Sequence, residues 1–253
     1  MIYIDRLPEN ADWIKHVPVR KPRALGGPGS GNFGHAGRPG ERGGSAPSGA
    51  AVADPAQVAD LAARMRPEAL DAAYDNWAQS LSHDERAGFS SYTSIEEYGP
   101  HGHSMMNHVL QGKYDNAPRV AHLKAQAEKQ AELLMKAIER APADALPPLV
   151  WRGLDGDIDY EVGTEVQMKG FQSTSVSPHM AGNFGDTILE IKPTAGAYLS
   201  GKNLAGKFSL AEHPQGVHER EFLLPHNKTY RVTGVSAAVF GGKARKIIQM
   251  EML

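Results

Sequence analysis

Residues 118–152 read PRVAHLKAQAEKQAELLMKAIERAPADALPPLVWR, and the pattern of this stretch changes near its end. Its first part, residues 118–140, carries apolar side chains at the three- or four-residue spacing of a helix with one buried face. These side chains are Leu123, Ala127, Ala131, Leu134 and Ile138. Pro147 and Pro148 then stop the helical part, and an apolar run typical of a strand follows. We therefore expect helices before this point and strands after it.

Upstream of this stretch the sequence predicts further helices, several of them from their start signals. Residues 54–55 (Asp-Pro) and Pro67 each place a proline at the first turn of a helix. Ser82 and Glu85 have the spacing of a capping box, which starts another helix. The apolar residues within 106–110 indicate one more.

Downstream of the two prolines, short segments rich in Val, Ile, Phe and Tyr alternate with Gly, Pro and Asn, the pattern of strands joined by turns. The predicted strands are residues 149–152, 164–168, 186–192, 196–199, 219–224, 229–235 and 244–252. Helices followed by strands indicate an α+β domain, which we place at residues 51–253.

The N-terminal fifth of the chain has a different composition. Residues 24–50 consist largely of Gly, Ser, Pro and Ala, and they hold too few large apolar side chains to offset the entropy lost on ordering. We interpret this segment as a flexible linker, with a tail that has no role as the alternative. Residues 1–23 mix aliphatic and aromatic side chains with basic ones, and we interpret them as a docking peptide.

The composition narrows the classes of function. The formal net charge of the 253 residues is -2, whereas nucleic-acid binders are usually basic. The chain has no cysteine, which excludes disulfides, thiolate metal sites and cysteine nucleophiles. No apolar run approaches the roughly 20 residues that span a bilayer, and the N-terminus lacks the pattern of a signal peptide. The spacing of His101, His103 and His108 does not fit a metal site. We expect a soluble protein without a nucleic-acid, membrane or metal partner.

Three motifs in the strand-rich half stand out, in this order: Val150-Trp151-Arg152-Gly153, Phe171-Gln172-Ser173-Thr174-Ser175, and His218-Glu219-Arg220-Glu221-Phe222-Leu223-Leu224-Pro225. Each has an ordinary structural explanation when it is taken alone. An arginine at a strand end usually forms a surface ion pair, and a Ser-Thr-Ser run is usually a polar strand edge. Alternating Glu and Arg usually form a solvated face. Their combination and order carry more information than any one of them.

Together these motifs resemble the Arg / Ser-Thr-Ser / Glu-x-Glu class of mono-ADP-ribosyltransferases, found in bacterial toxins and phage enzymes. The resemblance covers most of residues 67–253, because Trp77, Glu85 and Asn107 are similar to the helical lead-in of that family. A Gly-Pro-His insertion at 99–101 departs from it. The resemblance implies an α+β fold in which N-terminal helices precede a two-sheet β core with an NAD-binding cleft.

The resemblance also implies roles for individual residues. Arg152, with Gly153 beside it, would bind the pyrophosphate of NAD through the planar fork of the guanidinium. The Glu221 carboxylate would stabilise the oxocarbenium-like ribose as nicotinamide leaves. Ser173 would hold Glu221 in place. Thr174 and Ser175 would shape the rest of the NAD-binding loop.

Two further residues refine the expected site. On an extended segment Glu219 and Glu221 point to the same face, with Arg220 on the other. Glu219 would then meet the incoming acceptor, and a Glu at this position resembles the subclass that modifies arginine. Phe184 lies where related toxins carry an aromatic ring that stacks on nicotinamide, with a core residue as the equally weighted alternative.

The implied function is transfer of ADP-ribose from NAD, as co-substrate and without a metal, to an accessible arginine of a host protein. Two alternatives stay open: hydrolysis of NAD without a protein acceptor, and a phage head protein that keeps an inactive transferase fold. GGPGSGNFGHAGRPGERGGS, within residues 26–45, resembles a Gly-rich element of tailed-phage head proteins. That likeness implies phage head proteins as partners, virion association and action in the host cytoplasm, and delivery as a secreted toxin stays open as well.

Overall fold

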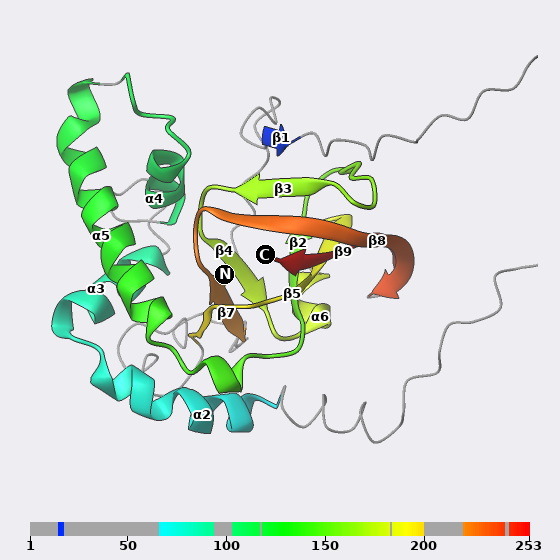
Figure 1. The fold of residues 1–253 in the computed structure, drawn as a ribbon, viewed down its shortest axis with the longest axis horizontal. Coiled ribbons are helices and arrows are strands. Elements are labelled where there is room, and N and C mark those ends of the chain that lie inside the picture. Colours follow the sequence, from blue (N-terminus) through cyan, green and yellow to red (C-terminus); the bar gives the residue numbers. More distant parts are fainter. Residues whose placement is uncertain are drawn as a thin grey trace, which may run out of the picture.

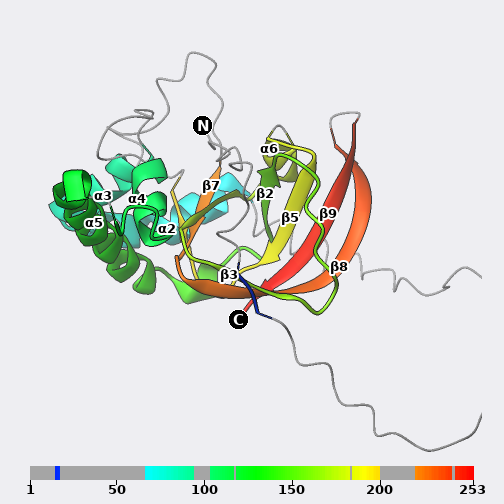
Figure 2. The same cartoon turned by 90° about the horizontal axis from the view of Figure 1, so that it is seen from above.

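A computed structural model describes residues 15–17, 66–93, 103–116, 118–182, 184–199, 220–240 and 243–253. Four α-helices and two short 3-10 helices precede most of the strands, and their bounds are α2 Pro67–Ser80, α3 His83–Tyr92, α4 His103–Leu110, η1 Pro118–Val120, α5 Ala121–Glu139 and η2 Ala143–Ala145. Figure 1 shows these helices on one side of the strands, and Figure 2 confirms this from above. The α+β class expected from the sequence is therefore confirmed.

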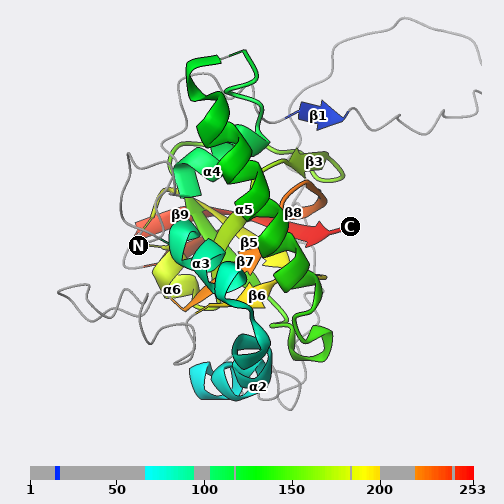
Figure 3. The ribbon, with the colours of Figure 1, turned by 90° about the vertical axis from the view of Figure 1, so that its left-hand side faces the viewer.

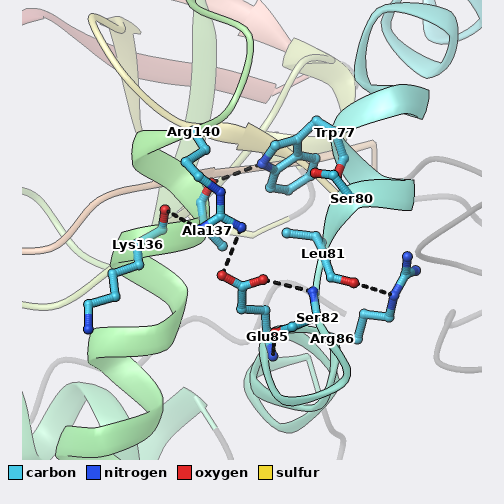
Figure 4. Close-up of polar contacts among 9 residues, drawn as sticks. All are labelled: Trp77, Ser80, Leu81, Ser82, Glu85, Arg86, Lys136, Ala137 and Arg140. Carbon is cyan, nitrogen blue, oxygen red and sulfur yellow. Dashed lines mark hydrogen bonds and ion pairs between the residues drawn. The ribbon is translucent and has the colours of Figure 1, made fainter.

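The helices begin where the sequence signals predicted. Pro67 opens α2, and Ser82 caps α3. The capping box is complete, because Ser82 Oγ accepts a hydrogen bond from Glu85 N (3.3 Å) and Glu85 Oε2 accepts one from Ser82 N (2.8 Å). Arg140 at the end of α5 binds the other carboxylate oxygen of Glu85 at 2.8 Å, which ties α3 to α5 (Figure 4). The helix expected to start at residues 54–55 lies outside the described residues.

The described strands form one sheet with the order β1-β3-β8-β9-β5-β2-β4-β7-β6. Their bounds are β1 Lys15–Val17, β2 Val150–Leu154, β3 Glu165–Met168, β4 Gln172–Ser175, β5 Thr187–Lys192, β6 Ala197–Tyr198, β7 Glu221–Leu224, β8 Lys228–Phe240 and β9 Lys243–Met252. Neighbours in this order are antiparallel except β5 and β9, which run parallel.

The expectation of two sheets needs a correction. The sheet has a large part and a small part. The large part consists of β1, β3, β8, β9, β5 and β2, and the small part consists of β4, β7 and β6. One register pair, Trp151 opposite Ser175, joins β2 to β4 and links the two parts into a single sheet. We call this β2–β4 junction the seam. The family resemblance implied two sheets, whereas this short ladder joins the two parts into one.

Several strand boundaries differ from those expected. β4 was not among the predicted strands, because its Gln-Ser-Thr-Ser sequence lacks the apolar residues that mark a strand. β8 extends to Phe240, five residues beyond its predicted end at 235. β1 lies within the expected docking peptide and pairs with β3, with Lys15 opposite Gln167. The rest of residues 1–23 and the expected linker at 24–50 lie outside the described residues.

Helices cover one face of the sheet, and a short helix covers part of the other. The main core lies between the sheet and helices α2 to α5, and its fully buried side chains include Tyr74, Leu134, Phe171 and Phe222. A smaller cluster of Trp151, Ala181, Ile188 and Ile247 packs on the other face, beneath the short helix α6 (Pro178–Ala181). Figure 3 shows α5 in front of the sheet, and Figure 2 shows α6 beside β2 and β5, apart from the other helices. Within the described ranges no helix is long and apolar enough to cross a membrane.

Candidate active site

The seam brings together three of the side chains selected from the sequence. Arg152 lies on β2, Ser173 on β4 and Glu221 at the start of β7. β4 lies between the other two strands, with Ser175 opposite both Trp151 and Glu221. Ser173 and Ser175 share one face of β4 because side chains alternate along a strand. Ser173 is thus a diagonal neighbour of Glu221, within reach of its carboxylate.

Hydrogen bonds connect these residues into a chain. Arg152 Nη1 donates to the backbone carbonyl of Ser173 at 3.0 Å, and Ser173 Oγ donates to Glu221 Oε1 at 2.5 Å. Arg152 and Glu221 are each only 7% exposed. Burying a charged group costs free energy unless other groups satisfy it. The fold therefore uses Ser173 to satisfy both buried charges, Arg152 through its backbone carbonyl and Glu221 through its hydroxyl.

The other two residues of the Ser-Thr-Ser motif make internal contacts. Thr174 is fully buried, and its hydroxyl donates to the carbonyl of Phe222 at 2.5 Å. Its side chain therefore lies on the core face, opposite Ser173 and Ser175. Ser175 Oγ accepts a hydrogen bond from Ser177 N at 3.0 Å, which fixes the turn between β4 and α6. Both residues were expected in a loop, whereas the structure places them in a strand.

Gly153 allows the chain that carries Phe184 to lie directly on β2. A Cβ atom at Gly153 would come within 2.2 Å of the Ala181 carbonyl oxygen and within 2.9 Å of Phe184 Cβ. Only glycine permits this approach. Phe184 is half-buried, and it therefore lies beside the residue that follows Arg152. The role of Phe184, in stacking on nicotinamide or in the core, stays a prediction.

The chain turns sharply just before Glu221. Arg220 has a φ of 51°, in the left-handed region that few residues other than glycine adopt. Its carbonyl accepts from Val176 N at 3.0 Å, and the Glu221 carbonyl accepts from Leu199 N at 2.9 Å. We expected an extended segment over 219–221, and this expectation is wrong at Arg220. β7 begins at Glu221, and Glu219 and His218 lie outside the described residues.

Two buried polar groups in this region, the Tyr230 hydroxyl and the Arg152 Nε, lack hydrogen-bond partners among the described residues. Tyr230 on β8 is fully buried, and its hydroxyl has no hydrogen-bond partner within the described part of the chain. Burial raises the pKa of the Tyr230 phenol far above its usual value, while the nearby Arg152 charge acts in the opposite direction. Tyr230 therefore stays protonated. Arg152 Nε is also buried without a hydrogen-bond partner among the described residues.

The sequence did not single out Arg245 on β9. Its pattern, Lys-Ala-Arg-Lys, is typical of a solvated strand end. In the structure this side chain is only 8% exposed, and it binds the loop that carries Phe184.

Across the described ranges, no group of three or more His, Cys, Asp or Glu side chains lies close enough to hold a metal ion.

A family model described as ADP-ribosyltransferase exoenzyme matches residues 71–253. The chain belongs to this family. Members of this family use NAD as the co-substrate. Arg152, Ser173 and Glu221 at the seam are therefore the candidates for binding and cleaving NAD. No curated protein sequence matches the chain at a significant level.

Solved structures of several bacterial toxins share the fold. Plx2a, an ADP-ribosyltransferase toxin from Paenibacillus larvae, is 19% identical with a TM-score of 0.54, over 77% of this chain and 96% of that one. The enzymatic component C2-I of the Clostridium botulinum C2 toxin is 17% identical with a TM-score of 0.54, over 74% of this chain and 48% of that one. BECa, an ADP-ribosylating toxin of C. perfringens solved with NADH, is 17% identical with a TM-score of 0.52, over 78% and 48%.

Proposed function

We propose that this protein is a mono-ADP-ribosyltransferase that cleaves NAD between nicotinamide and ribose and transfers ADP-ribose to an arginine of a host protein. The observation that carries the proposal is the hydrogen-bonded chain from Arg152 through Ser173 to Glu221. Family membership supports the use of NAD. The similar fold of BECa, solved with NADH, supports a site of the right kind for a nicotinamide dinucleotide.

Arg152 is the proposed anchor for the pyrophosphate of NAD. A guanidinium has five N–H donors in a planar fork. One nitrogen, Nη1, is fixed by the Ser173 carbonyl, and this bond orients the fork. Donors of the guanidinium that this bond does not use would meet the pyrophosphate. Gly153, next in the chain, lets the segment that carries Phe184 pack on β2 beside Arg152.

Glu221 is the proposed catalytic carboxylate. As the bond between ribose C1′ and the nicotinamide nitrogen breaks, its electron pair goes to nicotinamide, which leaves as a neutral molecule. Positive charge then develops on the ribose, and a fixed carboxylate beside it lowers the energy of that state. The 2.5 Å hydrogen bond from Ser173 fixes the orientation of the carboxylate before NAD arrives.

The arginine acceptor rests on Glu219. An arginine nitrogen attacks C1′, forms the new N–C bond and must lose a proton. A carboxylate at residue 219, two positions before Glu221, would orient the guanidinium and accept that proton. Without a protein acceptor, water attacks C1′ and the products are ADP-ribose and nicotinamide. The same Arg152, Ser173 and Glu221 would serve both reactions.

The place of action follows from the family and from the N-terminal segment. Exoenzymes of this kind act on host proteins, so we propose an arginine-bearing host protein as the partner and the host cytoplasm as the place of action. For the Gly-rich segment we propose a role in delivery. Residues 1–50 would bind phage head proteins, and the virion would then carry the protein into the host.

The test uses the full chain with NAD, first alone and then with agmatine as an arginine-like acceptor. Release of nicotinamide measures cleavage, and ADP-ribosylated agmatine measures transfer. Wild type should do both, and Glu219→Gln should lose transfer while much of the hydrolysis of NAD remains. Glu251→Gln, which changes an exposed carboxylate on β9 paired with Arg231, is the matched control and should change neither.

Each outcome has a defined consequence. Absence of NAD cleavage by the folded wild-type chain would overturn the enzyme proposal. NAD cleavage without any transfer, even to proteins of a bacterial lysate examined by mass spectrometry with labelled NAD, would establish the hydrolase instead. A parallel loss of both activities in Glu219→Gln would make that residue a structural partner of Glu221. If neither activity changes, Glu219 takes no part in transfer, and the assignment of arginine as the acceptor loses its basis.

A further inference from the structure

We propose that Arg245 is a positioning residue that fixes Phe184 at the nicotinamide end of the site. The proposal rests on the function proposed above, because Phe184 is the ring expected to stack on nicotinamide. The segment concerned, which we call the Phe184 loop, runs from residue 182 to residue 186, and residue 183 lies outside its described part.

Arg245 binds the Phe184 loop at both of its ends. Its Nη2 donates to the carbonyl of Gly182 at 3.0 Å. Its Nη1 donates to the carbonyl of Gly185 and to Asp186 Oδ1, the latter at 2.6 Å. One guanidinium therefore contacts residues before and after Phe184. A planar fork with several donors can do this, whereas the single ammonium of lysine presents no such geometry.

The opposite side of the Phe184 loop lies against β2. A Cβ atom at Gly185 would come within 2.1 Å of the Leu154 carbonyl oxygen, and one at Gly153 would meet Phe184 Cβ at 2.9 Å. Lys246 N donates to the Asp186 carbonyl at 3.1 Å, next to Arg245. The loop is thus clamped between β2, which carries Arg152, and the start of β9, which carries Arg245.

The backbone contacts of Arg245 matter more than its charge pairing. The Asp186 side chain is 82% exposed, and an ion pair with such an exposed partner contributes little. The two carbonyl groups are instead held by a side chain that is 8% exposed, where a hydrogen bond is well shielded from water. We therefore expect Arg245 to set where the Phe184 ring lies, without itself touching NAD.

The test compares Arg245→Met with Arg231→Met, which removes an arginine of β8 whose ion pairs with Glu165 and Glu251 lie on the surface. Arg245→Met should raise the KM for NAD roughly tenfold, the effect of losing one aromatic stacking contact, and should change kcat much less. Arg231→Met should leave both constants near wild type. Phe184→Ala should raise the KM by a similar factor, and the double variant Arg245→Met/Phe184→Ala should add nothing further, because both changes remove the same contact.

A second measurement does not depend on NAD. Hydrogen exchange of the peptide covering residues 180–187 should become faster in Arg245→Met and stay unchanged in Arg231→Met, with circular dichroism confirming that each variant is folded. Unchanged exchange would overturn the proposed clamp whether or not the protein cleaves NAD. Faster exchange with a wild-type KM, or KM effects that add in the double variant, would show that Arg245 does not act through Phe184. Failure of wild type to cleave NAD would overturn the proposed function and the role in binding with it.

Discussion

Helices α2 to α5, which we call the helical layer, bury a glutamate that is hydrogen-bonded to a serine, and so does the seam. The two regions use this glutamate differently. In the helical layer Glu85 caps the start of α3 together with Ser82, and it forms an ion pair with Arg140 at the end of α5 (Figure 4). Both oxygens of Glu85 serve the fold. At the seam, Ser173 holds Glu221 and binds Arg152 from strands far apart in the sequence. A buried charge is costly to keep unless other groups satisfy it. At the seam a buried carboxylate lies next to residues of all three motifs, and this difference is the reason to look for chemistry there.

Removing the charge of Glu221 should produce the largest effect. Glu221→Gln should lower both NAD cleavage and transfer by at least about a hundredfold, since a fixed group that stabilises transition-state charge contributes that much or more. The amide keeps the size of the side chain, so circular dichroism should match wild type. Glu85→Gln, at the corresponding position in the helical layer, should leave activity intact. Near-normal NAD cleavage by Glu221→Gln would remove Glu221 from the catalytic role.

Replacing one glycine in each region by alanine tests whether the seam tolerates a change in packing less well than the helical layer. At Gly153 in β2, a Cβ would meet the backbone oxygen of Ala181 at 2.2 Å, whereas at Gly88 in α3 it would meet Leu134 Cδ1, the end of a flexible side chain, at 2.8 Å. Gly153→Ala should therefore destabilise the protein by about 2 kcal/mol and weaken NAD turnover by displacing Phe184. Gly88→Ala should be close to neutral, because the gain of about 1 kcal/mol from helix propensity offsets the crowding.

Urea unfolding with nicotinamide release on the same samples checks the glycine pair. Equal destabilisation by the two alanines, or a stable Gly153→Ala with full activity, would mean that the segment around Phe184 can move away from β2 without consequence. The comparison would then no longer separate a rigid seam from an adaptable helical layer.

The contribution of the Glu85 carboxylate to the free energy of unfolding should depend on pH. Burial acts to raise the pKa of Glu85, but the hydrogen bonds from Ser82 and the charge and hydrogen bond of Arg140 outweigh burial and lower that pKa. A carboxylate whose pKa is lower in the folded state stabilises that state above its unfolded pKa, and the contribution is lost as the pH falls through the folded value. Glu85→Gln should thus cost about 1 kcal/mol at pH 7, and its difference from wild type should shrink below about pH 4.5.

Unfolding in urea between pH 3 and pH 7 measures the pH dependence of this difference. Lys136→Met, which removes an exposed ion pair with Glu132 on α5, serves as the control and should show a much smaller difference at every pH. A gap between wild type and Glu85→Gln that grows on acidification would contradict the lowered pKa.

The smallest effect is expected at the N-terminus. Deleting residues 1–50 removes β1, an edge strand of three residues that pairs with β3 away from the seam. NAD cleavage by the truncated chain should stay within about twofold of wild type, because each small surface change contributes little. A large loss of turnover in a folded truncated protein would place the N-terminal segment in the site.

The features that could be predicted from the sequence are those with local causes. The capping box of α3 and the start of α2 at Pro67 depend on residues a few positions apart, and both are confirmed. Arg152, Ser173 and Glu221 could be selected because their motifs resemble a known family, although they meet only through the pairing of distant strands.

What the sequence did not reveal depends on non-local contacts. β4 has no apolar pattern, and it is a strand because β7 pairs with it along its whole length. The left-handed φ at Arg220 has no glycine to announce it, so an extended segment was the natural expectation. Arg245 looks like a surface residue until the Phe184 loop folds over it. Tertiary contacts overrule local preference in all three cases.

The place of β9 in the sheet has a consequence for the order of events during synthesis. β9 lies between β8 and β5, and its residues, 243–252, follow every motif of the candidate site along the chain. A ribosome that has released residues up to 240 has therefore made Arg152, Ser173 and Glu221 but not the strand that joins β5 to β8. Domains that fold during translation wait for such long-range partners. Translation must therefore pass β9 before the sheet around the candidate site can be complete. A message cut short before that strand would yield a chain with every motif of the candidate site but without the strand that joins β5 to β8.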